Sequence, residues 1–234
     1  MKIGILNAIH PDASEVNWDG TPVDVYIRFF KSVDAPFEFV GYQVAQGEFP
    51  DSPEACDGYV ITGSPRGVYD DDEWIGQLAQ FIRAGYQAGK KLVGICFGHQ
   101  IIAHSLGGHA EKSDKGYGFG LKQFDVTQKR PWMSDQPDHC SLYFAHQDQV
   151  MTLPPEAELL GGNAFCPTAL YEIDNRVLGI QGHPEFTPGI MQDIVPSIED
   201  KMAPDALQTA LSSLNGTPDN KAVGHWIVNF LKSQ

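Results

Sequence analysis

The sequence predicts an α/β fold in which helices flank a doubly wound, mostly parallel sheet. Two observations carry this prediction. Short apolar runs at 59–62, 92–95 and 177–181 are typical of buried strands. Segments with helical spacing of apolar residues, at 21–33 and 73–88, lie between such runs. Strands that alternate with helices in this way favour a parallel sheet.

The other elements extend this pattern along the chain. Thr21-Pro22-Val23-Asp24 predicts a helix start, because Thr caps a helix, Pro suits its first position and an acid suits its third. Residues 7–20 are polar and are predicted to form a loop over the functional edge of the sheet. Further strands are predicted at 1–6, 37–45 and 142–145, and a hairpin-like pair at 169–173 and 176–181. After residue 187 only helices are predicted, at 188–202, 204–214 and 220–231.

Length and composition predict one domain over residues 1–234, with a C-terminal helical segment from about residue 188. The chain has 16 basic and 30 acidic residues, a formal net charge of −14, which argues against nucleic acid or an anionic membrane as partner. No run of ~20 apolar residues is present, so no membrane span is predicted. The first strand begins at the N-terminus without an export signal, and we therefore expect a cytoplasmic protein.

The metal-binding residue types are not spaced as ligands. The four cysteines show no C-x-x-C spacing, and we expect all of them to be reduced. The eight histidines show no H-x-x-x-H spacing, so the sequence predicts no metal site. The acidic run 70–73 lacks the alternating ligands and the distant Glu of a calcium loop, and it favours an acidic helix start instead.

Gly94-Ile95-Cys96-Phe97-Gly98 lies between the strand at 92–95 and a predicted helix at 99–106. A G-x-S-x-G sequence at such a junction forms a strained nucleophile elbow, and Cys can replace the Ser. The turn exposes the sulfur and points it at the N-terminus of the helix, where the dipole and the free N–H groups favour a thiolate. The pattern predicts Cys96 as a nucleophile.

A candidate base follows the strand at 177–181. His183 stands two residues before Glu185 in Gly182-His183-Pro184-Glu185, which is the spacing of a base and its orienting carboxylate in one turn. Parallel strands bring their C-terminal ends to one edge of the sheet, so Cys96 and His183 are expected to meet there. His146 is the rival candidate, and the strand-end context favours His183.

Four motifs, in this order along the chain, resemble the class-I glutamine amidotransferase, or triad glutaminase, domain family over residues 1 to about 190. They are Ile61-Thr-Gly-Ser-Pro65, Gly94-Ile-Cys-Phe-Gly-His-Gln100, Phe144-Ala-His-Gln-Asp-Gln-Val150 and Gly182-His-Pro-Glu185. The resemblance also predicts paired strands over residues 115–126. The expected fold is therefore a flavodoxin-like sheet with a nucleophile elbow.

The resemblance implies further site residues. The residue before the Pro in the first motif, Ser64, would supply an oxyanion N–H, although the family commonly has Gly there. The second N–H would come from Phe97, next to the nucleophile. Substrate-binding roles would fall to Gly63, Gln100, Gln147 and Asp148. No cofactor is implied.

Three functions remain open from the sequence. The first is a free-standing Cys96–His183–Glu185 hydrolase that cleaves a small γ-glutamyl amide or peptide through a thioester. The second is a glutaminase subunit that supplies ammonia to a separate synthase partner. The third is a non-catalytic binding protein on the same fold. A related elbow family of proteases and chaperones is disfavoured, because its members usually place His where Phe97 stands. The sequence predicts neither the leaving amine nor the oligomeric state.

Overall fold

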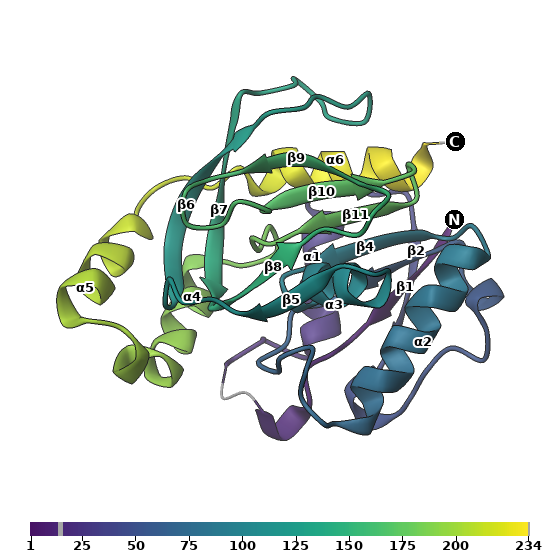
Figure 1. Ribbon diagram of the computed structural model, residues 1–234, viewed down its shortest axis with the longest axis horizontal. Helices are drawn as coiled ribbons and strands as arrows, with labels where there is room; N and C mark the ends of the chain where they lie inside the picture. Colours follow the sequence, from purple (N-terminus) through teal and green to yellow (C-terminus); the bar gives the residue numbers. More distant parts are fainter. Residues whose placement is uncertain (14–15, 234) are drawn as a thin grey trace.

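A mixed sheet forms the centre of the molecule (Figure 1). The computed structural model describes residues 1–13 and 16–233. Its strands are β1 (Lys2–Leu6), β2 (Glu38–Tyr42), β3 (Gly58–Ile61), β4 (Lys91–Ile95), β5 (His109–Lys112), β6 (Gly118–Val126), β7 (His139–His146), β8 (Asp148–Thr152), β9 (Ala157–Gly162), β10 (Leu170–Ile173) and β11 (Val177–Ile180). Within the described residues, the main sheet has nine strands in the order β2-β1-β3-β4-β11-β10-β9-β6-β7.

The sheet has a parallel half and an antiparallel half. Strands β2, β1, β3, β4 and β11 run parallel to one another. Strands β10, β9, β6 and β7 continue the sheet with antiparallel pairing. The predicted doubly wound sheet is confirmed, and so are the hairpin of β10 and β11 and the paired strands near 115–126, where β6 pairs with β7.

Three strands were not predicted. β5 and β8 form a separate two-stranded sheet, and β9 joins β10 to β6. Most residues of β5 and half or more of those of β8 and β9 are exposed or half-buried. Such strands have no continuous apolar run, which is the pattern that identifies buried strands in a sequence.

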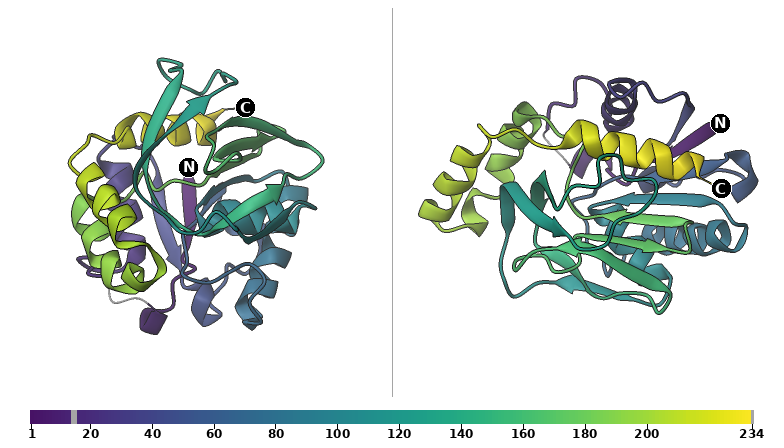
Figure 2. Two further views of the ribbon diagram at one scale, coloured as in Figure 1. Left: turned by 60° about the vertical axis from the view of Figure 1, so that its left-hand side comes forward. Right: turned by 90° about the horizontal axis from the view of Figure 1, so that it is seen from above.

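The helices pack around the outside of the sheet (Figure 2). They are α1 (Pro22–Lys31), α2 (Glu73–Gln87), α3 (Phe97–Ser105), α4 (Pro188–Ile194), α5 (Pro204–Ser213) and α6 (Asn220–Lys232). Short 3₁₀ turns occur at Pro11–Ala13, Val44–Gln46, Pro53–Ala55, Val195–Ser197 and Glu199–Lys201.

The alternation of side chains along the strands divides the core between the two faces of the sheet. Val93 and Ile95 of β4 pack in a cluster with Phe30 of α1 and Trp226 of α6. Leu92 of the same strand belongs to a second cluster that contains residues of α2 and α3. Successive side chains of a strand point to opposite faces, so α1 and α6 cover one face and α2 and α3 the other. A third cluster packs α4 and α5 against β6 and β7.

The predicted start of α1 is confirmed in atomic detail. The Asp24 N–H donates to the hydroxyl of Thr21, and the Thr21 N–H donates back to the Asp24 carboxylate at 2.8 Å. This reciprocal capping box satisfies donors that have no partner within the helix. It thereby fixes where α1 begins, and with it which residues of the helix face the sheet.

Two predicted elements are much longer than the observed ones. The helix predicted over 188–202 ends at Ile194 and continues as two 3₁₀ turns, because Pro196 has no N–H and its ring clashes with the preceding helical turn. The strand predicted over 37–45 ends at Tyr42 and is followed by a 3₁₀ turn that closes at Gly47, whose φ is 82°. That left-handed backbone suits glycine and ends the 3₁₀ turn.

The loop predicted over 7–20 crosses the C-terminal edge of the parallel strands, apart from Ser14 and Glu15, which lie outside the described residues. Among the helices of residues 1–13 and 16–233, none combines the length and the apolar character that a membrane crossing requires.

Candidate active site

Cys96 sits in a strained turn between β4 and α3. Its φ is 53° and its ψ is −105°, a backbone conformation that residues other than glycine rarely adopt. A Cβ on Gly94 would lie 2.4 Å from the carbonyl carbon of Gly98, and a Cβ on Gly98 would lie 2.3 Å from the Ile61 oxygen. Both glycines are therefore needed for the backbones to pass each other, as in the nucleophile elbow that the sequence predicts.

His183 and Glu185 form a buried pair beside this turn. The His183 Nδ1 lies 2.7 Å from Glu185 Oε1, and the side chains are only 4% and 1% exposed. The backbone N–H of His183 donates to the Tyr143 carbonyl of β7 at 2.8 Å. The ring of Phe186 stacks on the imidazole with a centroid distance of 3.8 Å and an interplanar angle of 8°. The Glu185 carboxylate and the Phe186 ring thus fix the imidazole, and the Tyr143 carbonyl fixes the backbone of His183.

The charges around His183 favour its protonated form. Burial lowers the pKa of the imidazole, but the charges of Glu185 and Cys96 and their hydrogen bonds outweigh burial and raise this pKa from 6.5 to about 10. At neutral pH the ring is therefore an imidazolium between a carboxylate and a sulfur. Such a ring can hold a proton for a leaving group.

His146 has the opposite environment. Burial dominates there and lowers the pKa of His146 from 6.5 to about 3. Its Nδ1 donates to the backbone carbonyl of Asp148 at 3.0 Å, and its ring packs between Phe144 and Phe165. His146 is thus a neutral ring bound to a carbonyl, whereas His183 is charged and bound to a carboxylate.

The loop after β3 reaches both Cys96 and His183. A Cβ on Gly63 would lie 3.0 Å from the His183 ring and 3.7 Å from the Cys96 Cβ, so this position passes close to both side chains. The next residue, Ser64, accepts a hydrogen bond from the Arg66 N–H through its hydroxyl at 3.2 Å. Phe97 is the first residue of α3, and first-turn N–H groups have no acceptor within their own helix.

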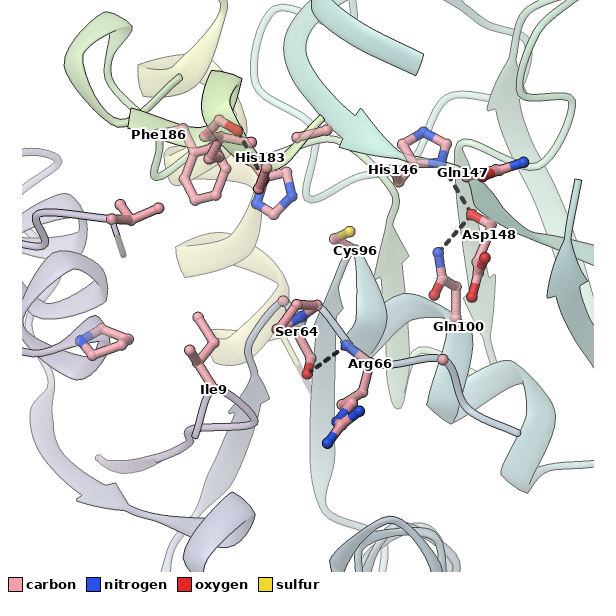
Figure 3. Close-up of a pocket in the computed structure, with 18 of the residues that line it drawn as sticks. Ile9, Ser64, Arg66, Cys96, Gln100, His146, Gln147, Asp148, His183 and Phe186 are labelled. Carbon is pink, nitrogen blue, oxygen red and sulfur yellow. Dashed lines mark hydrogen bonds between the residues drawn. The ribbon is translucent and has the colours of Figure 1, made fainter. Parts of the chain in front are cut away.

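Three of the four residues that the resemblance links to substrate, Gln100, Gln147 and Asp148, lie on the far side of Cys96 from His183 (Figure 3). The fourth, Gly63, lies beside the His183 ring. The Gln100 amide donates to the Asp148 carbonyl at 2.7 Å and to the Gln181 side chain at 3.2 Å. The Gln147 amide donates to the Ser113 carbonyl at 3.2 Å. The Asp148 carboxylate accepts a hydrogen bond from the Tyr69 hydroxyl at 2.9 Å. The amide groups of both glutamines thus help to build the wall of the site.

Sequence reasoning missed Tyr26, which lies on α1. Its hydroxyl donates to Glu185 Oε1 at 2.9 Å and accepts from the Gly63 N–H at 3.3 Å. The sequence offers one weak signal, because Tyr26 occurs on a buried helix face that otherwise carries Phe29 and Phe30. A buried Tyr needs a partner for its hydroxyl, whereas a Phe does not.

A cavity of about 750 Å³ joins these groups. All of the predicted site residues except Phe97 line it. Its outer part is formed by apolar residues of the N-terminal loop, α1 and the α4 region, which are Ile9, Val16, Trp18, Val25, Phe186, Ile194 and Pro196. Charged residues also line it, namely Asp12, Arg66, Asp70, Lys112, Asp193 and Lys201. The sequence predicted that the loop over residues 7–20 lies at this edge, but it did not identify the individual lining residues, because the fold brings them together from separate segments.

Nothing in the described part of the chain groups three or more His, Cys, Asp or Glu side chains as ligands for a metal ion. The four cysteines are all buried and free. Burial raises the pKa of the Cys140 thiol and raises that of Cys166 to about 12, so these two side chains lack the environment of a reactive thiol.

The fold is that of the glutamine amidotransferases. The profile of the class-I glutamine amidotransferase family matches residues 22–196, and the chain belongs to that family. The sequence prediction of the family is confirmed.

Two relatives from Arabidopsis thaliana are named gamma-glutamyl peptidases. The chain is 32% identical to gamma-glutamyl peptidase 5, over 82% of this chain and 81% of the relative. It is 30% identical to gamma-glutamyl peptidase 2 over the same shares of the two chains. The fold resembles a glutamine amidotransferase of Thermotoga maritima with a TM-score of 0.78, at 16% identity, and 99% of each chain is covered.

The elbow leads to a prediction about stability. Gly98→Ala should lower the free energy of unfolding by about 3 kcal/mol, because the new Cβ would meet the Ile61 carbonyl and neither backbone can move freely. Gly76→Ala is the matched control: Gly76 lies in α2 with no atom within 4 Å of a built Cβ, and the change should stabilise the protein by about 1 kcal/mol. Urea denaturation of both variants measures the difference. Equal effects of the two changes would contradict this account of the elbow.

Proposed function

We propose that this chain is a cysteine hydrolase that cleaves the γ-amide bond of a γ-glutamyl compound. The observation that carries the proposal is the Cys96 elbow beside the buried His183–Glu185 pair, at the floor of one cavity. The names of the Arabidopsis gamma-glutamyl peptidases support the same reaction class. Membership of the amidotransferase family supports glutamine-like chemistry at the cleaved bond.

The proposed reaction has two halves. The Cys96 thiolate attacks the γ-carbonyl carbon, and the N–H groups of Ser64 and Phe97 stabilise the oxyanion. The His183 imidazolium then gives its proton to the leaving nitrogen as the C–N bond breaks, which leaves a γ-glutamyl thioester. In the second half, neutral His183 takes a proton from water, and the hydroxide displaces Cys96 to release glutamate. Glu185 orients the ring and supports its charged form throughout.

The γ-glutamyl end of the substrate is assigned to the wall opposite His183. Gln100, Gln147 and Asp148 line the cavity there, whereas Gly63 lines it beside Cys96 and the His183 ring. Their backbone groups and side chains present the donors and acceptors that an amino acid with both charges requires. The hydrogen bond from Gln100 to the Asp148 carbonyl keeps the two segments in register.

The leaving group is assigned to the outer, apolar part of the cavity. Phe186 covers the imidazole that protonates the leaving nitrogen, and Trp18 lies 6.2 Å from Phe186 between ring centroids. A volume of about 750 Å³ suits a ligand considerably larger than free glutamine. These features support an amine or peptide as leaving group in preference to ammonia.

A glutaminase subunit is the second candidate. The chain is 31% identical to the GMP synthase [glutamine-hydrolyzing] of Neisseria meningitidis, over 56% of this chain and 24% of that protein. In that case a synthase partner would receive ammonia from this site. The sequence alternative of a non-catalytic binding protein is less well supported, because the elbow strain at Cys96 costs folding free energy that a binding site does not require.

The first experiment distinguishes these candidates. The purified chain, without ATP or a partner, should release an amine from γ-glutamyl amides or dipeptides faster than it releases ammonia from glutamine. Amine and glutamate release from such a panel measures this. Ammonia release from glutamine alone, feeble until a synthase is added, would instead support the subunit. The absence of turnover with every donor would support a binding protein.

The nucleophile is tested by substitution. Cys96→Ala should lower kcat/KM at least about a thousandfold while leaving the unfolding temperature near that of the wild type, because the covalent step is lost. Cys140→Ala is the control, since its thiol is buried away from the cavity and should be dispensable for the reaction. Inactivation by iodoacetamide with Cys96 unmodified would show that another residue is the nucleophile.

The base is tested by comparing two histidines. His183→Ala should be nearly as damaging as the loss of Cys96, His146→Ala should retain more activity, and Glu185→Gln should be less damaging than His183→Ala. A smaller loss in His183→Ala than in His146→Ala would reverse the assignment.

The pH dependence of the wild type gives a separate prediction. The value of kcat/KM should fall as the pH rises through about 10, where the His183 imidazolium loses the proton that the leaving group needs.

A further inference from the structure

The hydroxyl of Tyr26 lies between two parts of the proposed catalytic site that are far apart in the chain. It donates to Glu185 Oε1 at 2.9 Å, and that oxygen also lies 2.7 Å from the His183 Nδ1. The hydroxyl oxygen accepts from the Gly63 N–H at 3.3 Å, one residue before the proposed oxyanion donor Ser64. Tyr26 itself is 3% exposed.

The packing of α1 does not by itself require this hydroxyl. Tyr26, Phe29 and Phe30 form the buried aromatic face of the helix, and the two phenylalanines pack without a polar group. A hydroxyl buried without partners would destabilise the fold, so its two hydrogen bonds account for its presence. Burial and the neighbouring Glu185 carboxylate raise the pKa of Tyr26 well above its ordinary value, which keeps the hydroxyl protonated as a donor.

The Glu185 carboxylate depends on few donors. Its Oε1 receives both the Tyr26 and the His183 hydrogen bonds, while among the described residues no hydrogen-bond partner contacts its buried Oε2. Removal of one donor leaves the buried charge less well stabilised, and the carboxylate then attracts the imidazolium proton more strongly.

We propose that Tyr26 is a positioning residue that ties the oxyanion loop to the carboxylate of the triad through a single hydroxyl. This inference rests on the proposed hydrolase function. The hydroxyl holds Gly63, and with it the Ser64 N–H, at a fixed position relative to the Glu185–His183 pair. It also weakens the attraction between the Glu185 carboxylate and the proton of the His183 imidazolium. Three segments, α1, the loop after β3 and the turn after β11, are thereby fixed relative to one another.

Other titratable groups face the His183–Glu185 pair from the neighbouring elements. The charge of Cys96, in the elbow, raises the pKa of His183. The charge of His183 in turn helps to lower the pKa of His146, at the end of β7. Burial and the charge of Cys96 raise the pKa of Tyr117, which precedes β6. Tyr26→Phe leaves these groups in place, so a changed pH profile reports the Tyr26–Glu185 contact.

Tyr26→Phe is the test, and Tyr86→Phe is its matched control. Tyr86 also donates its hydroxyl to a carboxylate, that of Asp174 at 2.7 Å, but at the opposite end of the sheet. With γ-glutamyl-p-nitroanilide as the probe, Tyr26→Phe should lower kcat about tenfold and change KM less than about twofold. The alkaline limb of its kcat/KM profile should move up by about half a pH unit. Tyr86→Phe should show neither change.

A second measurement keeps the inference independent of turnover. The rate at which iodoacetamide alkylates Cys96, followed by peptide mass spectrometry across pH, responds to the loss of the His183 proton without any substrate. This alkaline transition should move to higher pH in Tyr26→Phe and stay unchanged in Tyr86→Phe. If the wild type hydrolyses no γ-glutamyl donor, the hydrolase proposal fails while this shift still supports the role of Tyr26.

A purely structural role would give a different result. The pH profiles of hydrolysis and of alkylation would then be the same in Tyr26→Phe as in the wild type. The unfolding temperature would be either lower or unchanged. Either of these outcomes would overturn the inference.

Discussion

The close approach of α3 to β3 and β4 is the constraint on which the site depends. The helix can begin directly after β4 only because Gly98 lies against the Ile61 carbonyl and Gly94 against Gly98. That crossing holds Cys96 at a positive φ and aims its sulfur into the cavity. The strained residue persists because the buried parallel strands on both sides leave the backbone no lower-energy path.

The second organising feature is a charge pair with little access to water. The His183 ring keeps its proton only because Glu185 and Cys96 outweigh the effect of burial. Phe186, the Tyr143 carbonyl and the Tyr26 hydroxyl supply the stacking and the hydrogen bonds around the pair. His146, equally buried but without a carboxylate on its ring nitrogen, remains neutral. One cavity thus contains one protonated and one neutral histidine, and the environment of each ring decides its charge.

The antiparallel half of the sheet supplies the rest of the cavity. β6 and β7 place residues 146–148 opposite His183, and the α4 region closes the outer side together with the N-terminal loop. The parallel half presents the elbow and the turn that contains His183 and Glu185 at one edge, where doubly wound sheets bind their ligands. The antiparallel strands therefore add a wall to this edge of the sheet, and the resulting cavity has a volume of about 750 Å³.

The sequence by itself determined the parallel half of the fold, the elbow and the pairing of His183 with Glu185. These features depend on local signals: apolar runs, glycines two residues either side of Cys96, and two residues within one turn. Only the tertiary structure decided which side chains Tyr26 and Trp18 contact. It also decided the pairing of three strands, β5, β8 and β9. The contact of Tyr26 with Glu185 spans 159 residues, and exposed strands gain their partners from other segments. No local pattern encodes such contacts, because they arise from the packing of α1 and the strand order of the complete sheet.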